Sequence, residues 1–155
     1  SAWSRVELWQ RTFKIVQDFP FTGISLLTFP VITDSLYPLF AAGPNAHVPH
    51  PHNVYLDVLS SFGIPGFVAL WMLIGSWGWT LLEAWYLANQ LETRIWKLAV
   101  LGLMGSAIAH LSFSLTDGML VGWSAGILFW VILGVSVALW RQLHAEVTKT
   151  NQKTD

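Results

Sequence analysis

The chain has 155 residues, of which 54% are hydrophobic and 11% are charged, and its formal net charge at pH 7 is −1. A soluble domain carries about 25% charged residues, so this composition excludes an ordinary water-soluble protein and favours one that packs against lipid. The near-zero charge argues against nucleic-acid binding, and the absence of cysteine excludes disulfides and thiolate metal sites.

The first 20 residues, SAWSRVELWQRTFKIVQDFP, predict an amphipathic helix. Ser4 and Glu7 have the spacing of a capping box, and Pro20 is expected to end the helix. At about 100° per residue, several large side chains share one broad apolar face. That face carries Trp3, Val6, Trp9, Phe13 and Val16, and the opposite face carries Glu7, Arg11, Lys14 and Asp18.

Arg5 is the exception to this pattern, because it projects into the apolar side close to Trp9 and Val16. One interpretation is that this arginine extends back to water or pairs with a nearby carboxylate. The other is that it is aimed at an anion held against the membrane surface. A planar guanidinium suits phosphate oxygens, since it donates two parallel hydrogen bonds.

Residues 20–46 are rich in Pro and Gly and show no clean period, so we expect an ordered loop with short helical pieces. Three histidines, His47, His50 and His52, then fall within six positions. The following segment, VYLDVLSSF, predicts a short helix at the membrane interface. It leads to Gly63-Ile64-Pro65-Gly66, where the first membrane span is expected to start.

Three kinds of chemistry suit the histidine cluster. Metal binding is the least favoured, because the chain has no cysteine and Asp57 is the only carboxylate nearby. The second is a structural or pH-sensing role, and the third and favoured one is general base catalysis by a neutral imidazole. Pro49 and Pro51 stiffen the segment, so His50 and His52 are expected to point the same way in an extended chain.

Three apolar runs are each near the ~20 residues that a helix needs to cross a bilayer. They cover residues 64–87, 97–115 and 119–140. The fold class is therefore predicted as an all-α membrane protein. We expect an outward-facing loop domain with short helices over residues 1–62, three transmembrane helices over 63–140, and a tail over 141–155.

Basic residues predict the orientation of these spans. They are Arg94 and Lys97 between the first two spans, and Arg141, Lys149 and Lys153 after the third. By the positive-inside rule both segments, and with them the C-terminus, are cytoplasmic, so residues 1–62 face outward.

Other features indicate neighbours for these helices. Gly118, Gly122 and Gly126 repeat every four residues, a pattern that lets another helix approach closely. The chain begins with Ser in the middle of an amphipathic pattern, so we expect a fragment of a larger multi-span protein. His110, inside the second span, either has a function or bonds to a neighbouring helix.

The arrangement His52-Asn53, nine residues, Gly63, two residues, Gly66 resembles the signature of the O-antigen ligase and polymerase superfamily of bacterial envelope glycosyltransferases. The family's large periplasmic loop is similar to Ser4-Arg5 with Leu8-Trp9, Asp18-Phe19-Pro20 and Gly23-Ile24 of this chain. The three spans and the basic tail fit the family's C-terminal portion. Ser25 replaces a glycine that the family often has, and Phe67 replaces a threonine typical of ligases proper. These departures weaken an assignment to the ligase that acts on lipopolysaccharide.

The resemblance implies an enzyme of polysaccharide biosynthesis that needs no metal or other cofactor. A glycan on undecaprenyl pyrophosphate would be transferred to an acceptor hydroxyl on the outer face of the bacterial inner membrane. His52 would be the catalytic base, and Arg5 would compensate charge on the leaving pyrophosphate. His50, Arg11 and Asn53 are candidate substrate-binding residues, although Asn53 is also expected to cap the short helix.

The implied partners are the polyprenyl-linked glycan, a glycan or lipid acceptor and the bilayer, with no nucleic acid. The alternative function is a membrane transporter of a small anion such as bicarbonate. A transporter places its site near the bilayer midplane, whereas the polar residues of this chain lie mostly outside the spans. Since the family needs further spans and another cation from upstream sequence, we expect these 155 residues alone to be catalytically inactive.

Overall fold

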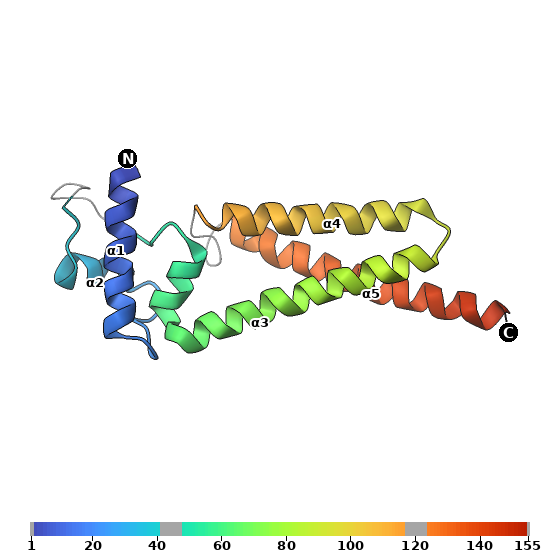
Figure 1. Cartoon of the computed structure of the whole chain (residues 1–155), viewed down its shortest axis with the longest axis horizontal. Coiled ribbons are helices and arrows are strands. Elements are labelled where there is room, and N and C mark those ends of the chain that lie inside the picture. The colour runs from blue at the N-terminus through green and yellow to red at the C-terminus, as the bar shows by residue number, and fades with distance from the viewer. Residues whose placement is uncertain (1, 41–47, 117–123, 155) are drawn as a thin grey trace. The chain divides into compact units, whose positions relative to one another are not determined.

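The computed structural model describes residues 2–40, 48–116 and 124–154. Over these ranges the chain is all-α, which confirms the predicted fold class. The helices are α1 (Ala2–Asp18), α2 (Phe29–Leu36), α3 (Val54–Gln90), α4 (Arg94–Phe113) and α5 (Ser124–Thr154) (Figure 1). Of these, α3, α4 and α5 are long and apolar enough to cross a membrane. The chain is therefore a multi-pass membrane protein.

The chain folds as two compact units. Unit 1 combines Ser1–Met72 with Phe113–Val121, and unit 2 combines Leu73–Ser112 with Gly122–Asp155. Unit 1 therefore contains α2, the start of α3 and the turn that follows α4. It also contains residues 48–53, which we call the histidine segment.

The core of unit 1 is built on one stripe of α1 that packs with Phe29 of α2. The stripe consists of Leu8, Thr12 and Ile15, which are buried at a spacing of four and three residues. Thr12 fits this apolar position because its hydroxyl donates a 2.8 Å hydrogen bond to the Leu8 carbonyl. The sequence predicted the helix, but it did not predict which side chains form the buried stripe, because threonine is not usually a core residue.

The predicted apolar face of α1 is only partly buried, since Val6 and Phe13 are about half exposed. The capping box was predicted to place Ser4 just before the helix, whereas α1 begins at Ala2 and includes Ser4. The Glu7 Oε1 atom accepts a 3.0 Å hydrogen bond from the backbone N–H of Phe40.

The end of α1 is joined to α2 by side chains. The Tyr37 hydroxyl, at the C-terminal end of α2, donates a hydrogen bond to the Asp18 carboxylate at the end of α1. This bond, with some burial, raises the pKa of Tyr37 to about 12. The described part of the 20–46 segment is thus an ordered connection with one short helix, as predicted.

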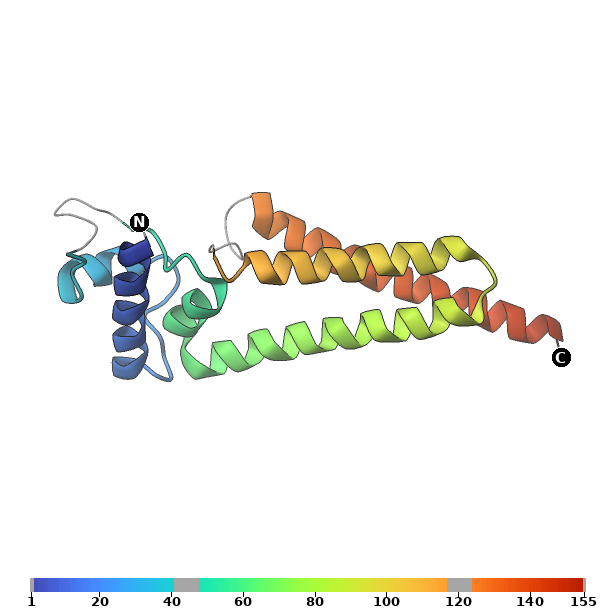
Figure 2. The same ribbon diagram turned by 45° about the horizontal axis from the view of Figure 1, so that its top comes forward.

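A sharp bend divides α3 into two arms, residues 54–62 and 64–90. At the bend Gly63 has φ 67° and ψ −166°, and Pro65 follows in the first turn of the second arm. The bend is visible in Figures 1 and 2 as the change of direction early in α3. The first arm is the short helix expected before the span, and the second arm extends through the predicted first span.

Unit 2 packs the second arm of α3 with α4 and α5. Its core cluster consists of Ala84, Leu87, Ala88, Val100, Leu143 and Val147. Glu83, in the second arm of α3, lies 3.0 Å from the His144 ring of α5. His110 of α4 is buried, and its ring centre is 5.4 Å from that of Phe129 in α5. This packing against a neighbouring helix agrees with the structural interpretation of His110.

The ends of α4 and α5 differ from the predicted span boundaries. The predicted start of the third span, residue 119, lies outside the described residues, as do Gly118 and Gly122. Gly126, the third glycine of the predicted packing pattern, is buried. The predicted tail after residue 140 continues α5 as a helix to Thr154. Leu143 and Val147 explain this continuation, since both are buried in the core of unit 2.

We predict that Gly63→Ala destabilises the protein while Gly75→Ala does not. A Cβ at Gly63 would lie 2.7 Å from the Pro20 and Phe21 carbonyl oxygens, and its φ and ψ lie in a region that essentially only glycine adopts. The cost is expected to be about 1–3 kcal/mol. At Gly75 nothing lies within 4 Å of an added Cβ, and alanine favours a helix interior.

The measurement is the thermal denaturation midpoint of each variant in detergent or lipid nanodiscs. An unchanged midpoint for Gly63→Ala would show that the bend does not depend on this backbone geometry.

Candidate functional site

The imidazole rings of His50 and His52 lie together, with centroids 4.4 Å apart and planes tilted by 59°. The backbone N–H of His52 donates a 3.2 Å hydrogen bond to Nδ1 of His50. Because that Nδ1 accepts a hydrogen bond, it carries no proton, and a neutral His50 ring has its proton on Nε2. His50 can therefore donate a hydrogen bond through Nε2.

The His52 backbone has φ +51°, in the left-handed region that side chains other than glycine rarely adopt. The two rings thus meet as expected, but through a turned backbone rather than the extended one that we predicted. This conformation costs about 1–2 kcal/mol. Such strain persists only where the surrounding structure holds the backbone in place, and it is concentrated at functional sites.

Trp9 of α1 holds the histidine segment from one side. Its indole Nε1 donates a 3.0 Å hydrogen bond to the carbonyl oxygen of Pro51, the residue between the two histidines, and Pro51 is buried. The sequence placed Trp9 on an apolar face and in a motif that resembles the family, but it did not predict this bond. No local pattern could have indicated the bond, because the two partners are 42 residues apart.

Asn53 holds the same segment from the other side and is buried. Its Oδ1 accepts hydrogen bonds from the backbone N–H groups of Tyr55 and Leu56, at 3.0 and 3.1 Å, which caps the first arm of α3. Its Nδ2 donates a 3.1 Å hydrogen bond to the Leu115 carbonyl. The predicted capping role is confirmed, and the amide is engaged at both ends by the protein itself.

The partners of this segment place it at the end of a membrane span. The backbone N–H of Val54 donates a 2.9 Å hydrogen bond to the Ser114 carbonyl, next to the Asn53–Leu115 bond. Ser114 and Leu115 directly follow α4, which ends at Phe113. The histidines are therefore fixed beside the terminus of a helix that is apolar enough to cross a bilayer.

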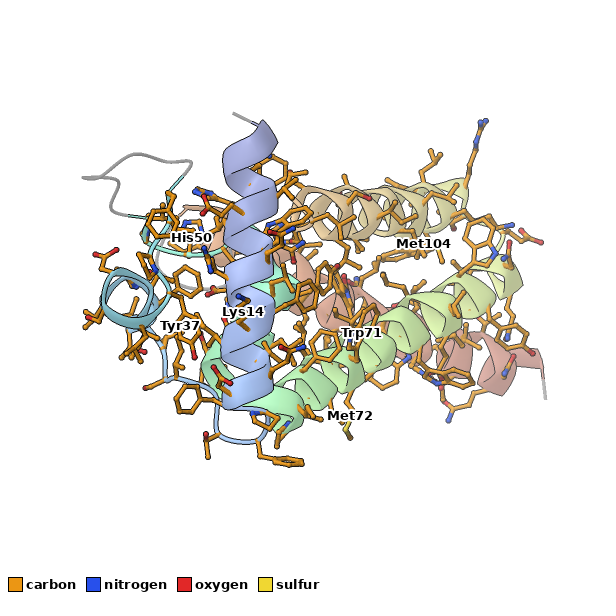
Figure 3. The ribbon with its side chains drawn as sticks, turned by 60° about the vertical axis from the view of Figure 1, so that its left-hand side comes forward. Lys14, Tyr37, His50, Trp71, Met72 and Met104 are labelled. Carbon is orange, nitrogen blue, oxygen red and sulfur yellow. The ribbon has the colours of Figure 1, made fainter. Side chains whose placement is uncertain are left out.

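Arg5 lies in the first turns of α1, the helix whose Trp9 contacts the histidine segment. It precedes Trp9 by four residues, so the two side chains share one helix face, about 6 Å apart along the axis. Arg5 is exposed. Figure 3 shows His50 on the segment that runs beside α1, and the Trp9–Pro51 bond joins the two. The role expected of Arg5 stays a prediction.

Arg11 is engaged within unit 1. Its guanidinium lies 3.7 Å from the Glu7 carboxylate and 5.7 Å from the centre of the Phe40 ring. The carboxylate also accepts the Phe40 backbone N–H. These contacts give Arg11 a structural role in holding residue 40 against α1, which makes it a weaker candidate than Arg5 for contact with an anion.

Among residues 2–40, 48–116 and 124–154 there is no group of three or more His, Asp or Glu side chains with the geometry of a metal site. His47, the first histidine of the cluster, lies outside these described residues.

Residues 1–71 match the family model described as O-antigen ligase. The match confirms the resemblance that the motifs predict, and it covers just under half of the chain. It includes α1, α2, the histidine segment, the bend at Gly63 and the start of the first span. No curated protein matches the chain.

We predict that Asn53→Ala destabilises unit 1 by about 1–2 kcal/mol, because it removes a helix cap and leaves the Leu115 carbonyl without its partner. The matched control is Asn89→Ala, which removes only an exposed bond from Nδ2 to the Trp85 carbonyl. Thermal denaturation in nanodiscs measures both changes. Equal effects of the two substitutions would contradict the role assigned to Asn53.

Proposed function

We propose that this chain carries the donor-binding and base-bearing part of a membrane glycosyltransferase that resembles O-antigen ligase. The enzyme transfers a glycan from a polyprenyl pyrophosphate to an acceptor hydroxyl. The observation that carries the proposal is the paired, backbone-strained histidine segment at the end of α4, within the region that matches the ligase family.

His52 is the proposed general base. A neutral imidazole nitrogen takes the proton from the acceptor hydroxyl as its oxygen forms a bond to the anomeric carbon of the donor sugar. The bond between that carbon and the diphosphate oxygen breaks, and its electron pair leaves with the polyprenyl pyrophosphate. His50, which can donate through Nε2, is suited to hold a phosphate or acceptor oxygen during this step.

Arg5 is the proposed partner of the leaving group. Negative charge increases on the diphosphate oxygens as the bond breaks, and a fixed guanidinium stabilises it without a metal ion. Arg5 is exposed and precedes by four residues Trp9, which bonds to the histidine segment, and this position supports the role. Arg11 and Asn53 support the site through their contacts with the protein.

The proposed reaction takes place on the outer side of the bacterial inner membrane, with the C-terminus of α5 in the cytoplasm. A donor whose lipid tail lies in the bilayer presents its diphosphate at the membrane boundary. The bonds from residues 53 and 54 to the turn after α4 support a site at that depth. The same position argues against transport of an anion such as bicarbonate, which requires a site near the midplane.

We predict that His52→Asn in the full-length protein lowers glycan transfer by at least about 100-fold, the lower end of the usual contribution of a general base. Asparagine tolerates the left-handed backbone better than most residues, so the variant removes the base while keeping the strained turn. The matched control is His144→Asn, which removes an imidazole of unit 2 that contacts Glu83.

Transfer is measured as the loss of lipid-linked glycan and the gain of glycosylated acceptor in membranes, with expression checked by immunoblot. Normal product formation by His52→Asn at wild-type expression would remove His52 from the mechanism.

We predict that Arg5→Gln lowers transfer by about 100-fold or more, because it removes charge stabilisation of the leaving group. Arg5→Lys keeps the charge but loses the planar fork, so an intermediate loss is expected. Lys14→Gln is the control, since it removes an exposed cation from the same helix. If Arg5→Gln and Lys14→Gln have equal effects, general charge rather than a specific contact is responsible.

A further inference from the structure

The connection between α1 and α2 exposes two large apolar side chains. In this segment, residues 20–28, which we call the anchor loop, Phe21 is 70% exposed and Leu27 is 81% exposed. The anchor loop, PFTGISLLT, contains no charged residue. A surface of this kind is unfavourable in water and typical of a segment that contacts another apolar phase.

The anchor loop is fixed to the bend of α3 by backbone hydrogen bonds. The Pro20 carbonyl accepts a 2.7 Å bond from the N–H of Ile64, the first residue of the second arm. The N–H groups of Ile24 and Ser25 donate bonds of 2.9 and 3.0 Å to the carbonyls of Ser60 and Ser61. The loop therefore cannot move independently of the point where the span begins.

Two glycines allow this close contact. A Cβ at Gly23 would lie 2.4 Å from backbone atoms of Ser61, and a Cβ at Gly63 would lie 2.7 Å from those of Phe21. The backbone of Phe21 is thus in contact with the bend itself. Phe62 and Ile64, on either side of Gly63, are also exposed.

The loop holds Leu27 outward in a strained conformation. Ser25 and Leu27 have φ values of 74° and 63°, in the left-handed region. The Thr28 hydroxyl fixes this turn by bonding to the Ser25 carbonyl at 2.9 Å and also to the Ile24 carbonyl. The turn keeps the Leu27 side chain exposed, and exposure of a leucine is unfavourable in water, so its position is best explained if Leu27 contacts lipid.

We propose that Phe21 and Leu27 insert into the outer interfacial region of the phospholipid bilayer, beside the start of the second arm of α3. The occupant of this surface is lipid because the loop is continuous with the exposed apolar surface of the span, through Ile64 and Val68. Aromatic side chains favour this depth of the membrane. The insertion fixes the end of α1 relative to the bilayer.

The absence of cysteine from the chain allows a direct depth measurement. Single substitutions Phe21→Cys and Leu27→Cys are labelled with a nitroxide, and the chain is reconstituted in phosphatidylcholine and phosphatidylglycerol nanodiscs. Power-saturation electron paramagnetic resonance then compares collisions with oxygen, which partitions into lipid, and with a water-soluble nickel chelate. Val68→Cys is the lipid-facing reference and Gln17→Cys, an exposed position of α1, is the aqueous one.

We expect labels at positions 21 and 27 to give an oxygen-to-nickel ratio several-fold above that at position 17 and close to that at position 68. A ratio equal to that at position 17 would place the loop in water and overturn the proposal. Low collision rates with both reagents would show that protein, either another segment or a second copy, covers the surface, and would also overturn it.

A label at Thr22→Cys keeps both apolar side chains and serves as the second test, since Thr22 is exposed beside Phe21. Its ratio is expected to lie between those of the two references. Because these measurements require only the membrane-inserted chain, they do not depend on glycan transfer, and failure of the proposed function would leave them unchanged.

Discussion

A buried backbone N–H group or side-chain amide needs a partner within the protein, because leaving it unpaired away from water is costly. Asn53 and Val54 meet this requirement through the carbonyls of Leu115 and Ser114. These two bonds fix the start of α3 beside the end of α4, and the position of the histidines follows from them. Trp9 adds a third bond, to Pro51, and so joins α1 to the same place.

The same principle organises the other end of the first arm of α3. At the bend the helix loses its regular hydrogen bonds, and the backbone of residues 20–25 supplies partners to residues 60, 61 and 64. This contact needs Gly23 and Gly63, since any side chain at either position would collide with backbone. The short first arm is thus held at both ends by residues distant in sequence.

The sequence was sufficient to predict the helices, but it did not predict the contacts between them. Long apolar runs predicted the three spans, and the apolar pattern predicted α1 and the short helix before Gly63. The bonds from Trp9 to Pro51 and from Asn53 to Leu115 cross 42 and 62 residues, and a single sequence carries no signal for such pairs. Thr12 was overlooked because a local bond to Leu8 makes it suitable for a core.

The bend at Gly63 also limits how far His50 and His52 lie from the start of the first span. A straight α3 of 37 residues would be about 55 Å long, well beyond the ~30 Å of hydrocarbon that it has to cross. In a straight helix, residue 52 would lie about 16 Å from Gly63 along the helix axis. In the proposed mechanism the bend shortens this distance, so that a diphosphate on a membrane-embedded tail would stay within reach of His52.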